Sequence, residues 1–203
     1  MKTIEDLLRA EPDVRDAAAR ASERALAAAH ALGLTDVSYA FEPSPLGDLL
    51  VAVTPRGLIR LAYNAEESAD SVLQELARRV SPRVVEAPAA LDEVRRELDE
   101  YFAGRRTSFA VPVDWRLHDG FGRRVLRATA RIPFGKVLTY GEVAAKAGSP
   151  RGGRPAGNAL GSNRIPIVVP CHRVVRSGGK IGGYTGGVER KEYLLGLEGA
   201  LPG

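Results

Sequence analysis

The residue with the clearest capacity for chemistry is the only cysteine of the chain, Cys171. It follows a short apolar run that contains Pro166 and ends in Pro170, and it precedes His172 and Arg173. An imidazole and a guanidinium beside a thiol can favour the thiolate, the reactive form of cysteine. The two prolines and the β-branched run predict a short strand with the cysteine just past its end, where functional side chains tend to be presented. A nucleophilic cysteine is therefore the leading interpretation, and an inert buried thiol is the alternative.

Composition excludes several other kinds of site. One cysteine rules out an internal disulfide and a multi-cysteine zinc cage, and His30, His118 and His172 show no metal-ligand spacing, so no metal is expected. The N-terminus lacks a basic segment followed by an apolar one, and no apolar stretch approaches the length of a membrane span. We therefore expect a cytoplasmic protein with no membrane partner.

Charge is spread unevenly along the 203 residues, although the net charge is only +4. Residues 131–203 carry eleven Lys and Arg against four Glu and no Asp, a local balance of +7 that leaves −3 for the rest. A cation excess gathered in one segment suits a polyanionic partner, because phosphate contacts release counterions. A solvated basic surface is the other interpretation.

The elements that position the thiol fall into two parts after an alanine-rich helical extension over residues 1–36, in which we see no chemistry. Residues 37–113 have an α/β pattern, and we place a domain boundary near residue 113. The predicted elements of this part are strands at 46–53 and 58–63 joined by a tight turn, helices at 66–80 and 90–102, and an alternating run at 107–113.

Residues 114–203 predict short helices. A helix over 120–131 is broken at Pro133, and Thr139 with Glu142 forms a capping-box pattern that starts a helix over 140–146. A further short helix falls within 154–161. Two short helices joined by a Gly/Pro/Ser turn in the basic part of the chain resemble a helix-turn-helix.

Two acid–base candidates accompany the thiol. His172 neighbours it, but adjacent side chains on extended backbone point to opposite sides, so a bridging water or a turn would have to couple the two. A structural hydrogen-bonding role for His172 stays open. Glu198 stands at the end of an apolar helix, where the helix dipole disfavours an acid, and that cost indicates a partner for its carboxylate.

Taken together, these residues resemble the O6-alkylguanine-DNA alkyltransferase family, whose members repair alkylated guanine in DNA. The resemblance covers roughly residues 37–199, and Pro170-Cys171-His172-Arg173-Val174 looks like the family signature. Further agreement in order and spacing is found at Ile132-Pro133, Gly135, Thr139-Tyr140-Gly141, Arg154, Gly157, Asn163, Gly183-Tyr184, Gly186-Gly187, Lys191 and Glu198.

The resemblance implies an α/β fold with an RNase-H-like N-terminal domain over 37–113 and a mainly helical C-terminal domain over 114–203 that carries the helix-turn-helix. It implies a DNA repair protein that flips the damaged nucleotide out of double-stranded DNA containing O6-alkylguanine. The alkyl group, methyl above all, would pass irreversibly to Cys171 in a single turnover without a cofactor. A monomer is expected, and acceptance of O4-alkylthymine is left open.

The same resemblance assigns roles to single residues. Cys171 would be the alkyl acceptor, with His172 acting through a water as its base and Glu198 orienting the imidazole. Asn163 would tie the helix-turn-helix to the active-site loop. Tyr140 would steer the target phosphate and hydrogen-bond the flipped base. The remaining assignments are DNA contacts at Thr139, Tyr140, Gly157 and Arg154, the last of which would fill the gap in the base stack, and a substrate pocket formed by Pro166, Val174, Tyr184 and Thr185.

This chain departs from the family pattern near its second short helix. Pro155 follows Arg154 where a helix-compatible alanine is usual, so the recognition helix is expected to start late. Arg164 follows Asn163 where proline is common.

Two other functions stay open on the sequence. A non-catalytic binder of alkylated DNA or a helix-turn-helix regulator would use the same pocket as a sensor, although such relatives usually lack the cysteine. A Cys-His hydrolase would need an oxyanion site and a second base that we do not find.

Overall fold

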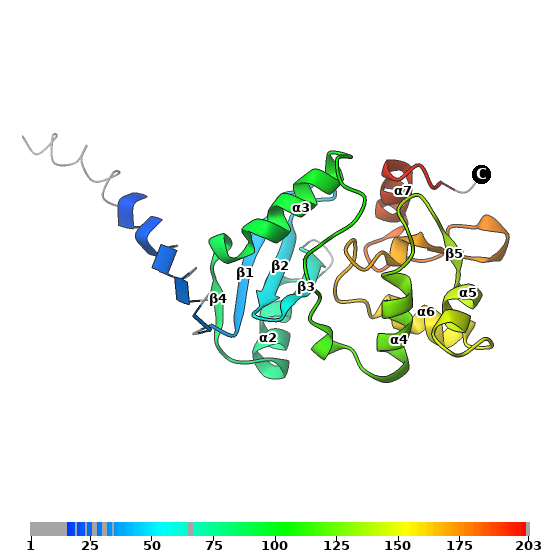
Figure 1. The fold of residues 1–203 in the computed structure, drawn as a ribbon, viewed down its shortest axis with the longest axis horizontal. Helices are drawn as coiled ribbons and strands as arrows, with labels where there is room; N and C mark the ends of the chain where they lie inside the picture. Colours follow the sequence, from blue (N-terminus) through cyan, green and yellow to red (C-terminus); the bar gives the residue numbers. More distant parts are fainter. Residues whose placement is uncertain are drawn as a thin grey trace, which may run out of the picture.

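The computed structural model describes residues 16–18, 20–22, 24–25, 28–29, 32–33, 35–64 and 67–201. Figure 1 shows an α/β lobe built on a sheet and, beside it, a mainly helical lobe that contains the C-terminal part of the chain. Between 16 and 29 the described residues are helical, and the rest of the helix predicted for the N-terminal extension lies outside them.

The sheet of the first lobe has the order β3-β2-β1-β4. The hairpin of β2 (Leu49–Thr54) and β3 (Gly57–Tyr63) is where the sequence predicts it. The sequence analysis missed β1 (Val37–Glu42) and β4 (Val84–Glu86), which pairs in parallel with β1. Three residues are too few to show a period, so β4 has no readable local signal.

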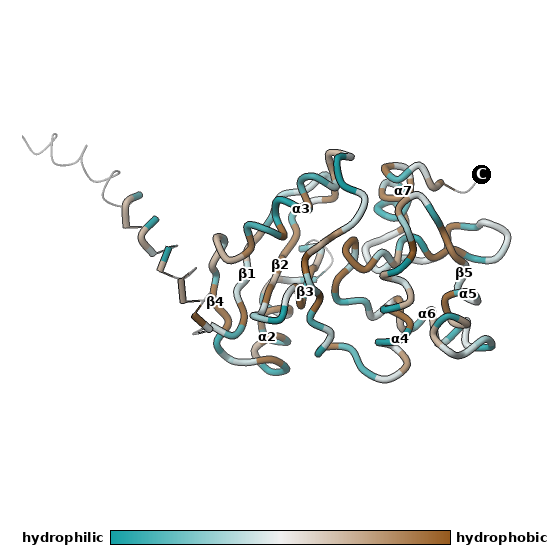
Figure 2. The backbone as a smooth tube through the Cα atoms, in the orientation of Figure 1, coloured by the Kyte–Doolittle hydropathy of each residue, from teal (hydrophilic) through white to brown (hydrophobic). Residues whose placement is uncertain are grey.

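Each face of the sheet is covered by one helix because β2 is apolar on both sides. Leu49 and Val51 belong to the core that includes α3 (Asp92–Phe102), whereas Leu50 and Ala52 belong to the core that includes α2 (Ala69–Arg79). Successive strand residues point to opposite faces, so this alternation gives two layers of helix around one sheet. Figure 2 shows brown apolar segments along β2 and β3.

Gly57 lets the linker between the lobes run against the hairpin. Its φ is +121°, and a Cβ there would lie 2.0 Å from the carbonyl oxygen of Pro112. Leu58 donates its N–H to that oxygen at 2.8 Å, and Thr54 Oγ1 donates to Asp114 Oδ2 at 2.7 Å. The alternating run at 107–113 forms no strand, and among the described residues it makes one isolated bridge to β3, from Val113 to Leu58.

The second lobe is helical, as the sequence predicts, around a two-stranded parallel pair. Its core is continuous with the α3 side of the sheet, since Tyr63 and Tyr101 share one apolar cluster with residues such as Val125 and Leu194. The elements are α4 (Gly120–Thr129), β5 (Leu138–Thr139), α5 (Tyr140–Lys146), α6 (Gly153–Gly161), β6 (Val174–Val175) and α7 (Val188–Leu197).

Two local expectations are wrong. Helix α6 starts at Gly153, not late, because Pro155 lies in its first turn, where an N–H has no intrahelical acceptor. The run before the cysteine is a compact turn and not a strand: Val169 donates its N–H to Ile165 O at 2.9 Å, and Ile167 has a φ of +71°. A β-branched residue at positive φ is strained, and such strain persists only where surrounding contacts over-determine the backbone.

Candidate active site

The thiol stands at the start of a 3₁₀ turn, Cys171–Arg173, that directly follows the strained loop. Cys171 is 5% exposed, and Asn163 Nδ2 lies 3.1 Å from its Sγ as a hydrogen-bond donor. A cavity of about 240 Å³ reaches the thiol from outside. Its walls are formed by Tyr140, Gly157, Leu160, Gly161, Cys171, Gly183, Tyr184 and Thr185.

Burial dominates the acidity of this thiol. It raises the pKa of Cys171 to about 11, although the hydrogen bond from Asn163 and the positive charge of Lys191 both oppose the shift. The sequence-based expectation of a favoured thiolate is therefore wrong for the resting protein, because desolvation outweighs the neighbouring cations. At neutral pH the group that faces the cavity is a neutral thiol, which needs a base to become a nucleophile.

His172 is in the protonation state that such a base requires. It is fully buried, and burial lowers its pKa, with Glu198 opposing the change, so the ring is neutral at neutral pH. Its Nε2 lies 2.9 Å from Glu198 Oε1, and this contact assigns the ring proton to Nε2. Its Nδ1 has no hydrogen-bond partner among the described residues and is left as a proton acceptor.

Glu198, at the C-cap of α7, accepts hydrogen bonds from two further side chains besides His172. Arg173 donates through Nε and Nη2, each at 2.8 Å, and Tyr101 from α3 donates its hydroxyl at 2.6 Å. Burial would raise the pKa of Glu198, but the hydrogen bonds from His172 and Arg173 lower it to about 2. The carboxylate is therefore a permanent anion that holds the imidazole, and the partner expected for this acid is present.

Arg173, Tyr101 and Lys191 were not among the predicted site residues. Arg173 belongs to the signature, so its presence was visible in the sequence, but its bidentate partner was not. Tyr101 carries no local signal because it comes from the other lobe. Lys191 is fully buried, donates from Nζ to Val174 O at 2.5 Å, and has a pKa lowered to about 8 by burial.

The predicted pocket residues are brought together only in part. Tyr184 and Thr185 line the cavity, and the Tyr184 hydroxyl bonds to that of Tyr63 from β3 at 2.8 Å. Val174 is fully buried in β6 and does not line the cavity. Pro166 lies instead at a small crevice between the lobes.

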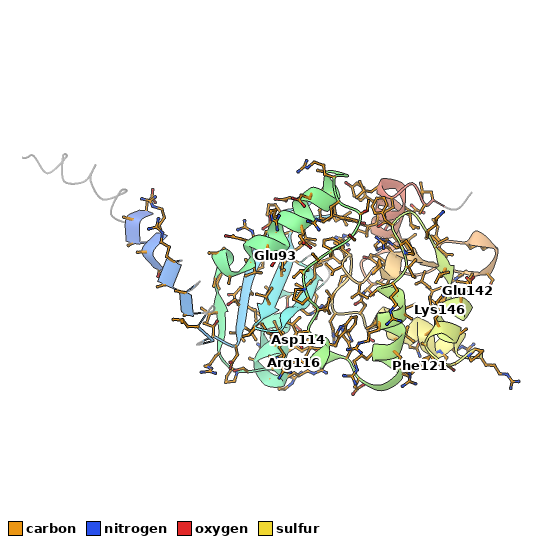
Figure 3. The ribbon with its side chains drawn as sticks, in the orientation of Figure 1. Glu93, Asp114, Arg116, Phe121, Glu142 and Lys146 are labelled. Carbon is orange, nitrogen blue, oxygen red and sulfur yellow. The ribbon has the colours of Figure 1, made fainter. Side chains whose placement is uncertain are left out.

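The helix-turn-helix forms the outer side of the site. Thr139 caps α5, and the reciprocal bonds of the predicted capping box with Glu142 are present. Figure 3 shows Glu142 and Lys146 on α5, to the right of Phe121 on α4. Arg154 is exposed in the first turn of α6, and Gly157 on the same helix faces the Tyr140 ring, because a Cβ on Gly157 would lie 3.8 Å from that ring.

Among the described residues there is neither a candidate membrane span nor a candidate metal site. No helix among them is long and apolar enough to cross a membrane. In the same part of the chain, no group of three or more His, Cys, Asp or Glu side chains is placed to hold a metal ion.

A cysteine in a cavity beside a carboxylate-held imidazole, with a helix-turn-helix at the rim, defines a class of helix-turn-helix proteins with a nucleophilic thiol. Comparison with known families makes this specific. The family model described as "6-O-methylguanine DNA methyltransferase, ribonuclease-like domain" matches residues 37–115, and the one described as "DNA binding domain" of the same methyltransferase matches residues 120–200. The chain belongs to the 6-O-methylguanine DNA methyltransferase family.

Individual relatives agree with this assignment. The chain is 34% identical over 163 residues, 79% of its length and 94% of the relative's, to the constitutive methylated-DNA–protein-cysteine methyltransferase of Bacillus subtilis. It is 36% identical over 80% of its length to the methyltransferase of that name from Methanosarcina acetivorans, and covers 98% of it. The crystal structure of the Mycobacterium tuberculosis O6-methylguanine methyltransferase aligns with a TM-score of 0.69 at 36% identity, over 81% of this chain and 94% of that one.

A related solved structure contains DNA. The Mycobacterium tuberculosis OGT in complex with DNA aligns with a TM-score of 0.69 at 37% identity, over 79% of this chain and 92% of that chain. The α/β fold class, the ribonuclease-like N-terminal lobe and the helical C-terminal lobe expected from the sequence are confirmed.

Proposed function

We propose that this protein repairs O6-alkylguanine in double-stranded DNA by transferring the alkyl group, methyl above all, to Cys171. The observation that carries the proposal is the thiol at the wall of a cavity, beside a neutral imidazole that Glu198 holds in one tautomer. Membership of the family and the names of the relatives support the reaction class. We also propose a domain boundary near residue 113, a monomer, and the cytoplasmic location expected from the sequence.

Proton movement precedes the bond changes in this mechanism. The Cys171 proton passes through a water to His172 Nδ1, the ring nitrogen that is free to accept it. The imidazolium that forms is stabilised by the Glu198 carboxylate at 2.9 Å. Because the pKa of the Cys171 thiol is about 11, transfer of its proton to His172 is unfavourable by itself. It becomes favourable as the negative charge on the sulfur passes into the bond that forms with the alkyl carbon.

The sulfur then attacks the sp³ carbon of the alkyl group. A C–S bond forms as the C–O6 bond breaks, and the electron pair of that bond stays on the guanine. The guanine takes up, through water, the proton that His172 received from the thiol, so the repaired base is neutral and the imidazole returns to its neutral form. A thioether is a very poor leaving group, so each chain acts once and no cofactor takes part.

The outer residues deliver the nucleotide to the thiol. A base inside a duplex is out of reach, and flipping it out costs a few kcal/mol of stacking and pairing. Arg154, exposed at the start of α6, fills the gap in the stack, while Tyr140 steers the phosphate and hydrogen-bonds the base. Asn163 ties α6 to the thiol, and the Tyr184 ring and Thr185 flank the base in the cavity.

Intact-mass measurement after mixing the protein with a duplex that contains O6-methylguanine tests the proposal. We expect one permanent methyl group per chain, located on Cys171. A lesion binder would give no adduct, and a hydrolase would turn over substrate without one. Either result would reject the transfer mechanism.

A further inference from the structure

A partly buried group of charges joins the two lobes beside the loop that leads to the thiol. Arg60 on β3 and Glu75 on α2 belong to the α/β lobe, as does Glu67, which precedes α2. Arg164 belongs to the helical lobe and immediately follows Asn163. We name these four residues, Arg60, Glu67, Glu75 and Arg164, the junction cluster.

The junction cluster holds Arg164 by its backbone and by its side chain. The Arg164 carbonyl accepts a hydrogen bond from Leu61 N at 2.9 Å and another from Arg60 Nη1 at 3.1 Å. The Arg164 guanidinium lies 3.0 Å from Glu75 Oε1 through Nη2. Arg60 pairs with Glu67, and its side chain is only 3% exposed, so its hydrogen bonds are shielded from water.

The residue next to Arg164 makes the only side-chain hydrogen bond to the thiol found among the described residues. Asn163 Nδ2 donates to Cys171 Sγ at 3.1 Å and to Val169 O at 2.9 Å, and its Oδ1 accepts from Ile165 N at 3.0 Å. All three bonds lie within the loop from 163 to the thiol. Asn163 therefore sets the shape of the loop, but nothing in these bonds anchors the loop to the rest of the molecule.

The loop needs such an anchor because it is strained. Ile167 has a φ of +71°, a conformation that costs a β-branched residue free energy and persists only when the surroundings over-determine it. The hydrogen bonds and ion pairs at Arg164 supply fixed contacts at the beginning of the loop, one residue from Asn163.

We propose that the junction cluster is a positioning device for Cys171: by fixing Arg164 on the α/β lobe, it fixes Asn163 Nδ2 on the thiol. The four residues touch neither DNA nor the alkyl group in this proposal. The inference rests on the proposed alkyl transfer and extends it, because it gives the ribonuclease-like lobe a defined contribution to the rate.

Two variants break the same ion pair with opposite changes in net charge. Arg164→Met removes a cation but keeps an unbranched apolar stem, and Glu75→Gln removes an anion and keeps the length of the side chain. We expect each to lower the single-turnover rate of methyl transfer about three- to tenfold at saturating protein, since small misplacements of reacting groups have effects of this size or larger. The affinity for duplex is expected to change less than twofold, and Arg164→Lys is expected to restore most of the rate.

The double variant and a remote control separate positioning from stability. Arg164→Met with Glu75→Gln is expected to be no slower than the slower single variant, because either change alone already breaks the Arg164–Glu75 pair. Arg83→Met breaks a more exposed ion pair with Asp36 at 2.9 Å, at the β4 edge of the sheet opposite β3, and is expected to leave the rate unchanged. Proton NMR of the Asn163 side-chain amide gives a readout without substrate, and we expect its resonances to shift in both single variants but not in Arg83→Met.

The outcomes are distinct. Absence of a methyl adduct in the unmodified protein would reject the proposed function, and the amide resonances would then decide on the positioning role alone. If the unmodified protein transfers methyl and both single variants transfer it as fast as the unmodified protein, the junction cluster does not position the thiol. A lowered affinity with an unchanged rate would overturn the inference as well.

Discussion

The helical lobe contains two regions of opposite character, one around Glu198 and one on the outer side of α5 and α6. Around Glu198 the polar side chains are buried and converge on a single carboxylate, which holds His172, Arg173 and Tyr101 by hydrogen bonds. On the outer side of α5 and α6 the charges are exposed, and Arg154 extends from the first turn of α6. In the first region the side chains hold one another in place by hydrogen bonds, whereas in the second the charged side chains act separately at the surface.

This difference predicts how the two regions respond to change. Removing a partner from the buried network leaves another charge unpaired away from water, which costs several kcal/mol. Removing an exposed cation costs little stability and affects only the ligand that it meets. A single substitution in the buried network is therefore expected to lower the rate of methyl transfer strongly. A single substitution of an exposed cation is expected to lower the affinity for DNA only slightly.

The largest expected effect is at the thiol. Cys171→Ser is expected to abolish methyl transfer, because a hydroxyl is a weak nucleophile near pH 7, while duplex affinity stays near that of the unmodified protein. Intact mass and fluorescence anisotropy on a labelled duplex measure the two quantities. Full transfer by the serine variant would exclude Cys171 as the acceptor.

The next largest effect is at the buried carboxylate. Glu198→Gln is expected to slow transfer about 100-fold, since the imidazolium loses its counter-charge, and to lower the free energy of unfolding by about 3 kcal/mol as Arg173 loses its anionic partner. Single-turnover kinetics and denaturant titration measure these losses. A variant with normal rate would show that this carboxylate does not support the base.

The same variant changes the dependence of stability on pH. The pKa of Glu198 is lowered from 4.5 to about 2, so the unfolded chain binds the extra proton between these values. The stabilisation is present in full above about pH 4.5 and is lost as the pH falls toward 2. Acid unfolding followed by circular dichroism is expected to show a smaller loss over that window in Glu198→Gln than in the unmodified protein.

A smaller and more selective effect is expected on the outer region. Arg154→Ala is expected to slow repair of duplex about tenfold while leaving transfer from free O6-methylguanine base unchanged, because the side chain is proposed to support flipping and not chemistry. The salt dependence of duplex binding is expected to decrease by about one counterion. Arg96→Ala removes an exposed cation from α3 and is the control for charge alone. Equal loss on both substrates would remove the flipping role.

The outer region was easier to predict from the sequence than the buried network. Thr139 with Glu142 specified the start of α5 correctly, because capping chemistry acts over three residues. The position of the cysteine next to its imidazole was likewise readable. The pKa of the thiol was not, because it depends on burial by parts of the chain that are distant in sequence.

Two of the missed site contacts depend on the other lobe. Tyr101 reaches Glu198 across 97 positions of the chain, and Tyr63 reaches Tyr184 across 121. No local period or cap encodes such a bond. The turn before the cysteine was mispredicted because nothing in the local sequence indicates a positive φ at a β-branched residue such as Ile167.

The smallest expected effect concerns the cap of α5, where stability and binding meet. Thr139→Ala removes the side chain that accepts from Glu142 N at 3.2 Å and is expected to lower the free energy of unfolding by about 1 kcal/mol. Ser68→Ala, which removes the cap of α2 in the other lobe, is expected to cost a similar amount and serves as the matched control. Only Thr139→Ala is expected to weaken duplex binding, by about two- to threefold, because α5 carries Tyr140 at its first position. Thermal unfolding and anisotropy compare the pair, and equal duplex affinities would mean that the start of α5 does not contribute to the DNA-binding surface.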